Sequence, residues 1–243
     1  GIDAYGWRDT FILCGIVMAL VPLLALPFIG DSPPASEGPA QSVSEAVREA
    51  RSHSGYILLT LGFFVCGFHV TFVGTHLPAF LADENVSSDV ASYAFALIGL
   101  ANIVGAYTFG ALGDRYRKKN LLTYIYLGRA VVMAAILIVP ITDATSVVFG
   151  LVFGVLWLGT VPLTSGIVAQ VFGVRYFGML FGVVMLSHQL GSFAGAWLGG
   201  LIHDLTGSYD VMWMLSAALG LIAAALHWPI NDRPLARLQQ QPA

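Results

Sequence analysis

Residues 110–119 read GALGDRYRKK, and they lie between two long apolar stretches. Four of the eleven Lys and Arg residues of the chain fall in this short segment. Basic residues next to membrane spans are retained on the cytoplasmic side. The segment therefore predicts a cytoplasmic loop between two membrane-spanning helices, and it sets the orientation of the spans on either side.

The composition of the chain is typical of an integral membrane protein. Of its 243 residues, 57% are hydrophobic and 10% are charged, whereas a soluble domain carries about 25% charged residues. The net charge of −3 offers no basic surface for nucleic acid, so we expect a lipid bilayer and no nucleic acid as partner. Cys14 and Cys66 lie in apolar runs, which favours packing roles and gives no spacing for a disulfide framework or a metal site.

Seven segments are long and apolar enough to cross a hydrocarbon core, which takes about 20 residues as a helix. The predicted fold is all-α and integral to the membrane, with seven transmembrane helices at residues 11–30, 55–82, 90–113, 120–141, 146–171, 176–203 and 210–230. Arg8 lies in a segment on one side of the membrane and Arg129 within a span, while the other Lys and Arg residues fall on the side of GALGDRYRKK. This charge pattern predicts a cytoplasmic C-terminus.

The longest connection, residues 31–54, begins DSPPASEGPAQS and continues SVSEAVREARS. The second part predicts a short surface helix capped by Ser42 or Ser44. One span precedes this linker and six follow it. Because one span cannot fold alone, and the chain begins at Gly1 without an initiator Met, we expect an N-terminal part to be missing.

With these spans in place, the chain resembles the C-terminal part of a major facilitator superfamily transporter. The cytoplasmic motif of that family, Gly-x-x-x-Asp-Arg-x-Gly followed by basic residues, is matched here by Gly110, Asp114, Arg115, Lys118 and Lys119. Arg117 stands where the second glycine is expected. The stretches GWRDTF, THLPAF and DLTGSY are similar to the bacterial monocarboxylate-porter-like branch of the family.

The resemblance implies a fold of two six-helix halves, of which this chain supplies helices six to twelve. Residues 1–30 would form a periplasmic entry and the last helix of the N-terminal half, and residues 31–54 the cytoplasmic interdomain linker. Residues 55–231 would form the six-helix C-terminal half, and residues 232–243 a cytoplasmic tail. The missing N-terminal half would be a partner, and the location a bacterial inner membrane.

The motif itself has two interpretations. Gly110 and Gly113 allow close approach at a helix end, Asp114 can accept hydrogen bonds from a helix N-terminus, and Arg115 can pair with a carboxylate or a lipid phosphate. The alternative is a plain basic loop that fixes orientation. Both interpretations make the motif conformational rather than part of a solute site.

Polar residues within the spans mark function by default, because they are costly in a bilayer. His69 and His76 share a helix face two turns apart, where they can bind an anionic solute or carry a proton. The alternative is a neutral histidine that bonds a neighbouring helix. His188 lies three residues before Gly191 in the series Gly191, Gly195 and Gly199, so it can meet solute or proton, or a helix contact.

Two further groups of candidates lie at the centre of their spans. Trp157, Thr160 and Thr164 form a stripe next to Pro162, which we expect to kink the helix and to shape a cavity wall; the alternative is ordinary packing. Arg129 can bind a carboxylate, pair within the protein or snorkel to the interface. Asn102 can bind solute or bond another helix.

These features predict a secondary active transporter fragment that moves a small solute, such as a monocarboxylate or other organic anion, by alternating access. The alternatives are a drug or metabolite efflux carrier of the same superfamily and a non-transporting membrane sensor. An enzyme is disfavoured, since no carboxylate pair, metal cluster or nucleophile motif lies near the spans. A retinal receptor would need an intramembrane lysine, and Lys118 and Lys119 lie in the loop. We expect no cofactor or metal; a proton symporter remains open, with a histidine here or a group in the missing half as the carrier.

Overall fold

The computed structural model describes residues 2–25 and 41–239, which form helices and turns with no strand among them. The helices are α1 (Ile2–Ala25), α2 (Val43–Ser52), α3 (Ser54–Asp83), α4 (Ser88–Arg115), α5 (Lys118–Ile136), α6 (Asp143–Leu156), α7 (Thr160–Phe172), α8 (Phe177–Thr206), α9 (Asp210–His227) and α10 (Ala236–Gln239). The predicted all-α membrane fold is confirmed.

The described residues contain five candidate membrane spans: α3, α4, the span formed by α6 and α7 together, α8, and α9. The predicted span at 11–30 runs beyond the described residues. The predicted span at 120–141 is shorter in the structure, where α5 ends at Ile136. Pro140 explains this end, because proline lacks an N–H donor and disfavours the helical conformation of the residue before it.

The chain divides into two compact units, Gly1–Glu37 and Gly38–Ala243. In the first unit, α1 is interrupted at Gly6, whose φ of 75° is a left-handed value that suits glycine. The hydroxyl of Thr10 donates to the Gly6 carbonyl at 2.8 Å and so occupies an acceptor near the interruption.

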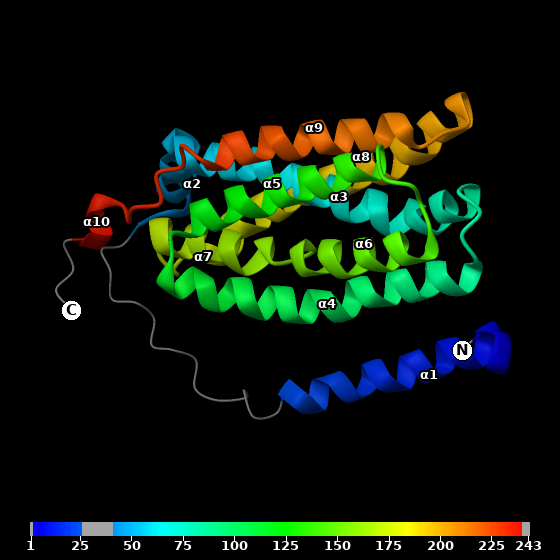
Figure 1. Cartoon of the computed structure of the whole chain (residues 1–243). Coiled ribbons are helices and arrows are strands. Elements are labelled where there is room, and N and C mark those ends of the chain that lie inside the picture. Colours follow the sequence, from blue (N-terminus) through cyan, green and yellow to red (C-terminus); the bar gives the residue numbers. More distant parts are fainter. Residues whose placement is uncertain (1, 26–40, 240–243) are drawn as a thin grey trace. The chain divides into compact units, whose positions relative to one another are not determined.

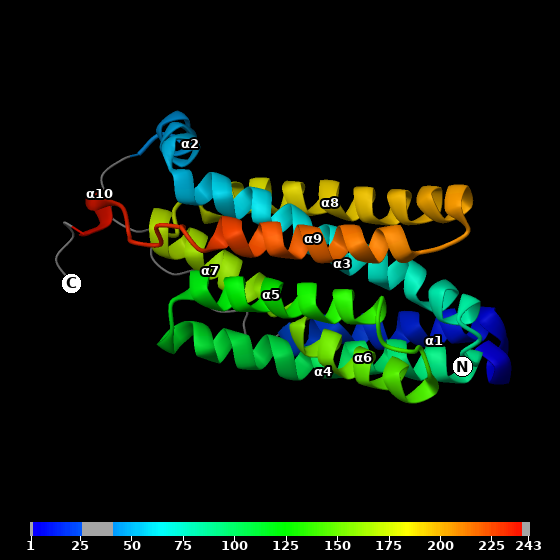
Figure 2. The ribbon, with the colours of Figure 1, turned by 45° about the horizontal axis from the view of Figure 1, so that its top comes forward.

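In the second unit, the long helices run beside one another in three closely packed pairs (Figures 1 and 2). These pairs are α3 with α8, α4 with α6, and α5 with α9. In addition, α7 contacts α4 and α5, and α3 contacts α9. Among the candidate spans, α3 is the most buried helix of the bundle.

The tightest pair, α3 with α8, depends on glycine. A Cβ atom on Gly191 would overlap the carbonyl oxygen of Phe64, and one on Gly67 would overlap that of His188. The predicted close approach along Gly191, Gly195 and Gly199 is confirmed. Backbones this close gain dispersion contacts that larger residues would prevent.

Two apolar clusters fill the bundle, one toward each end. Along α5 the first cluster ends at Tyr126 and the second begins at Met133, so the buried Arg129 lies between them. His69 and Thr160 are also buried polar residues near this level. The middle of the bundle therefore holds a polar layer between two apolar ones.

The helix α2 and the segment after α9 lie at the same end of this unit (Figure 1). Ser42 caps α2 and forms a capping box with Glu45, which confirms one of the two predicted caps. The Arg237 guanidinium bonds the Glu49 carboxylate at 3.0 Å and the Phe172 carbonyl at 2.8 Å. These bonds join α2, α7 and α10.

Candidate functional site

A break in a helix lies at the centre of the bundle. The span Asp143–Phe172 is interrupted between Leu156 and Thr160, at its middle. On both sides of the break, backbone hydrogen bonds run to the residue three positions earlier instead of four. The Trp157 amide bonds the Gly154 carbonyl, and the Val161 amide bonds the Leu158 carbonyl, each at 3.0 Å. The irregularity expected from Pro162 is present as a break in the turn before it, where Pro162 has no N–H for the Leu158 carbonyl and Val161 bonds that carbonyl instead. Pro162 falls in the first turn of α7, where a missing N–H costs little.

Arg129 of α5 binds the carbonyls that the break exposes. Its Nε and Nη2 donate to the Leu156 carbonyl at 2.9 and 2.7 Å, and Nη2 also donates to the Trp157 carbonyl. The side chain has no exposed surface. Of the three predicted behaviours of Arg129, the geometry is that of pairing within the protein, and the side chain does not snorkel.

Asn102 of α4 binds the break from the other side. Its Oδ1 accepts a hydrogen bond from the Leu158 amide at 3.0 Å. A regular helix would direct that amide to the Gly154 carbonyl, which here bonds Trp157. Asn102 and Arg129 thus satisfy backbone donors and acceptors that lipid could not. Sequence could identify both residues as polar and central, but not their shared partner.

Cys66 belongs to the same cluster, although its sequence context suggested only packing. Its buried thiol lies 3.1 Å from the Thr160 hydroxyl and 3.5 Å from Arg129 Nη1. Thr164 is buried one turn further along α7, and its hydroxyl has no bonding partner within the described residues. A cysteine within an apolar run has no sequence signal that could have revealed these contacts.

Trp157 lies within the break and keeps part of its surface exposed. Its ring meets Phe153 edge-on, with centroids 5.4 Å apart. The ring also lies above Gly74 of α3, where an added Cβ would be 3.7 Å from it. The break thus turns a large aromatic side chain toward α3 at the middle of the bundle.

The three candidate histidines differ in their partners. His69 is fully buried and bonds the Ser216 carbonyl of α9 at 2.8 Å. His76 bonds the Ala196 carbonyl at 2.8 Å and the Tyr209 hydroxyl at 3.3 Å. Both imidazoles therefore join α3 to neighbouring helices.

His188 is half-buried and bonds two side chains of its own helix and the Cys66 thiol of α3. Its Nδ1 lies 3.1 Å from the Gln189 side-chain oxygen and 3.5 Å from the Ser192 hydroxyl. Its ring packs against Phe63 at 4.9 Å. Among the candidates near the middle of their helices, Asn102, Trp157 and His188 thus retain exposed surface, whereas Arg129, His69, Thr160 and Thr164 are buried.

The GALGDRYRKK segment lies at one end of the bundle, away from the break. The loop expected here is reduced to a turn at Tyr116 and Arg117, because α4 continues to Arg115 and α5 begins at Lys118. Gly113 packs against Leu163, and a Cβ atom added to Gly110 would lie 4.0 Å from Pro162. Lys118 donates to the Gln170 side chain at 3.3 Å, and Lys119 donates to the Trp228 carbonyl at 3.0 Å. These contacts tie the loop to α7 and to the end of α9.

The remaining charged residues of the loop behave in two ways. Asp114 and Arg115 are exposed, with no hydrogen bond or ion pair to another described residue. Arg117, which replaces the expected glycine, pairs with Asp232 at 2.5 Å, and this hydrogen bond raises the pKa of Arg117. Arg117 therefore attaches the loop to the segment that follows α9.

Residues 2–25 and 41–239 contain no cluster of three or more His, Cys, Asp or Glu side chains that could hold a metal ion. The chemistry available at the break is that of hydrogen bonding, aromatic contact and one half-buried imidazole.

Comparison with known proteins agrees with this architecture. A family model described as Major Facilitator Superfamily matches residues 1–164 and, in an overlapping alignment, residues 59–242. The uncharacterized MFS-type transporter YcxA of Bacillus subtilis (strain 168) is 27% identical over 219 residues, covering 84% of this chain and 52% of that protein.

Two further relatives have more specific names. Monocarboxylate transporter 12-B of Danio rerio is 24% identical over 260 residues, covering 93% of this chain and 54% of that protein. The sialic acid transporter NanX of Escherichia coli (strain K12) is 23% identical over 219 residues, covering 86% and 51%. The chain therefore spans about half the length of these relatives.

Proposed function

We propose a transport role for this chain, which belongs to the major facilitator superfamily. The chain would be the C-terminal part of a secondary active transporter, with α3 to α9 as the six-helix C-terminal half and α1 as the last helix of the N-terminal half. It would move a small organic anion, such as a monocarboxylate, by alternating access in a bacterial inner membrane. The C-terminus would lie in the cytoplasm.

The observation that carries this proposal is the capped helix break at the middle of the bundle. Discontinuous helices near the bilayer midplane are a recurrent feature of solute sites in transporters, and here the break can serve a solute through the side chain of Trp157 that it presents. Here Arg129 and Asn102 hold the break open by bonding its backbone groups. A break whose backbone groups had no partner would be costly in lipid, and these two side chains supply the partners.

The helices α4 and α8 present the surface that an N-terminal half would contact. Only 17% of the apolar window of α4 and of α8 is buried, compared with 56% for α3. Each of these helices carries an exposed apolar stripe at helical spacing. The stripes are Leu100, Ile103, Val104 and Tyr107 on α4, and Leu186, Leu190, Phe193 and Trp197 on α8.

We assign solute contact to the central residues that keep exposed surface: Trp157, Asn102 and His188. Arg129 and Thr160 would position the break, and the buried Thr164 would offer its unpaired hydroxyl to the wall. His69 and His76 would join helices. The motif residues Gly110, Gly113, Asp114, Arg115, Lys118 and Lys119 would act in conformational change.

The class of solute is inferred from the relatives, whose names include a monocarboxylate transporter and a sialic acid transporter. A half-buried imidazole and the free amide group of Asn102 can donate hydrogen bonds to a carboxylate. The buried guanidinium of Arg129 adds positive charge behind them. An efflux carrier for drugs or metabolites, or a membrane sensor, would use the same fold with a different solute.

For proton coupling, His188 is the carrier that this half offers. The groups that face it are Cys66 from α3, Arg129 from α5, and Gln189 and Ser192 from its own helix. His69 and His76 each bond a backbone carbonyl of a neighbouring helix at 2.8 Å, so both already have a structural role.

The test is uptake of radiolabelled monocarboxylates into proteoliposomes that contain the complete transporter. We expect His188→Gln to change the pH dependence of uptake, and His69→Gln and His76→Gln to lower the amount of folded protein with the pH profile kept. An unchanged profile in His188→Gln would remove this half from the proton path. No uptake above empty vesicles, across monocarboxylates and efflux substrates, would overturn the transport role itself.

A further inference from the structure

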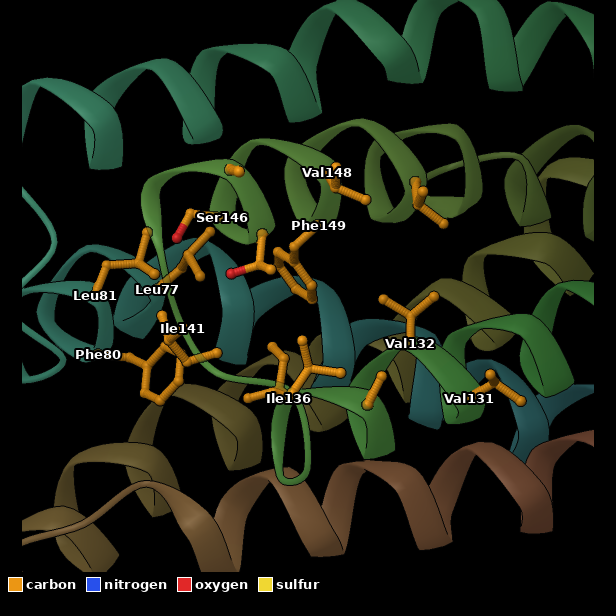
Figure 3. Close-up of a pocket in the computed structure, with 15 residues that line it drawn as sticks. Leu77, Phe80, Leu81, Val131, Val132, Ile136, Ile141, Ser146, Val148 and Phe149 are labelled. Carbon is orange, nitrogen blue, oxygen red and sulfur yellow. The ribbon is translucent and has the colours of Figure 1, made fainter.

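An apolar cavity of about 330 Å³ lies between the end of α3, the end of α5 and the start of α6. Figure 3 shows side chains from these helices and from the 137–142 connection turned toward one space. Leu77 and Phe80 come from α3, Val132 and Ile136 from α5, and Val148 and Phe149 from α6. The cavity is separate from the helix break.

The walls of this cavity leave no polar atom to hold water. The Ser146 hydroxyl donates to the Thr142 carbonyl at 2.8 Å, and the Thr145 hydroxyl donates to the Pro140 carbonyl at 2.9 Å. Apolar cavities without polar partners stay dry and take up hydrocarbon; one of about 150 Å³ binds benzene. The present cavity has more than twice that volume.

The mouth of the cavity opens among membrane-spanning helices. Val131, Val148 and Val152 line the cavity and are 67%, 56% and 44% exposed. Since α6 belongs to a span, the medium outside this mouth is lipid hydrocarbon. An acyl chain is the apolar molecule that is always present there.

The charges in the connections at this end of the bundle limit the headgroup. The connections at this end, residues 83–89 and 137–143, contain Asp83, Glu84, Asp89 and Asp143 and no Lys or Arg. The Asp83 carboxylate is bonded to His203 at 3.0 Å, which leaves Glu84, Asp89 and Asp143 to meet a headgroup. An anionic headgroup would meet these three carboxylates without a Lys or Arg in the two connections to bind it, whereas a zwitterionic one could place its ammonium beside them.

We propose that this cavity binds one acyl chain of a membrane phospholipid, with preference for a zwitterionic headgroup such as phosphatidylethanolamine. The occupant contacts Phe149, which stacks on Phe153 at 5.2 Å. This lipid site lies within the C-terminal half, and its lining contains none of the residues to which solute contact is assigned, Trp157, Asn102 and His188.

The experiment uses phosphatidylethanolamine with a diazirine in one acyl chain, and the full chain in nanodiscs. After illumination, labelled peptides are mapped by mass spectrometry. We expect labelling concentrated on the α5 and α6 residues of the cavity, above that of Leu221 and Ile222, which are exposed on α9. Labelling spread over all exposed helix faces in proportion to their area would overturn the proposal.

Two variants sharpen the test. Ala135→Phe places a ring in the cavity and leaves room for a shorter stretch of acyl chain. If the chain loses two buried methylene groups, its binding constant falls by roughly tenfold, and cavity labelling should fall on the order of tenfold with it. Ala225→Phe makes the same change on an exposed face of α9 and should leave labelling unchanged. Equal labelling in Ala135→Phe and the wild type would contradict the site.

The headgroup is tested with the same diazirine chain on phosphatidylglycerol. We expect weaker cavity labelling from this anionic lipid, and stronger labelling would contradict the headgroup preference. Should Ala135→Phe fail to fold, Val148→Phe narrows the mouth instead, and the wild-type pattern alone already separates a site from a general lipid coat.

Discussion

Arg129→Met should destabilise the protein strongly, because the side chain holds the broken helix by its carbonyls. Its removal leaves the Leu156 and Trp157 carbonyls without their donor, in a bundle where lipid offers no replacement. An unsatisfied buried carbonyl costs about 1–3 kcal/mol, so two cost about 2–6 kcal/mol. Total stabilities are only about 5–15 kcal/mol, and the expected fall in melting temperature is roughly 5–20 °C.

Cys66 provides the assay for this variant. It is buried, whereas Cys14 is exposed. In a Cys14→Ser background, a maleimide dye reacts with Cys66 only when the bundle opens, so the dye signal reports unfolding. Arg129→Lys keeps the charge but loses the planar fork of donors, and it should recover part of the loss.

The matched control is Arg115→Met, which removes an exposed arginine that has no bonding partner in the described residues. Surface changes of this kind stay within about 0.5 kcal/mol. If Arg129→Met melts at the same temperature as Arg115→Met, then Arg129 does not support the break and the reasoning is refuted.

Two neighbouring glycines and one exposed carboxylate give further predictions. Gly199→Ala should lower the free energy of unfolding by about 1–3 kcal/mol, because the added Cβ would overlap the His76 ring. Gly200→Ala, whose Cβ would lie 3.8 Å from that ring, should leave the free energy of unfolding unchanged or raise it by up to about 1 kcal/mol. Equal melting temperatures of the two variants would contradict the packing of His76 against Gly199. Hydrogen bonds from Ser42 lower the pKa of Glu45. The amides of α2 should therefore be protected from hydrogen exchange above the usual carboxyl pKa, and they should lose this protection as the pH falls through the lowered pKa. Hydrogen exchange of residues 43–52 measures this loss. Glu45→Gln should reduce its pH dependence, while the Glu49–Arg237 pair stays in both proteins; the same pH dependence in both proteins would exclude Glu45 as a source.

The helices could be predicted from the sequence because long apolar runs have few alternatives in a bilayer. The same holds for the capping box at Ser42, which uses residues three apart in the chain. The early end of α5 has a local cause in Pro140. Local signals of this kind require no knowledge of the rest of the fold.

The break could not be placed from the sequence, because its partners come from other helices. Pro162 indicated an irregularity, but the position depends on Arg129 and Asn102 reaching residues 156–158 from α5 and α4. The histidines show the same limit. His69 and His76 bond backbone carbonyls, and a carbonyl acceptor has no sequence signature.

The central claim is that the break at Trp157 lies on the path of the solute. A cysteine at position 157, in the complete transporter with Cys14→Ser and Cys66→Ala, tests it with membrane-impermeant maleimide applied from either side. We predict labelling from both sides and less labelling when solute is bound, with Val131→Cys, on the lipid-facing side of α5, unlabelled. A Trp157→Cys protein that resists the reagent from both sides, as Val131→Cys does, would contradict a place for the break on the solute path.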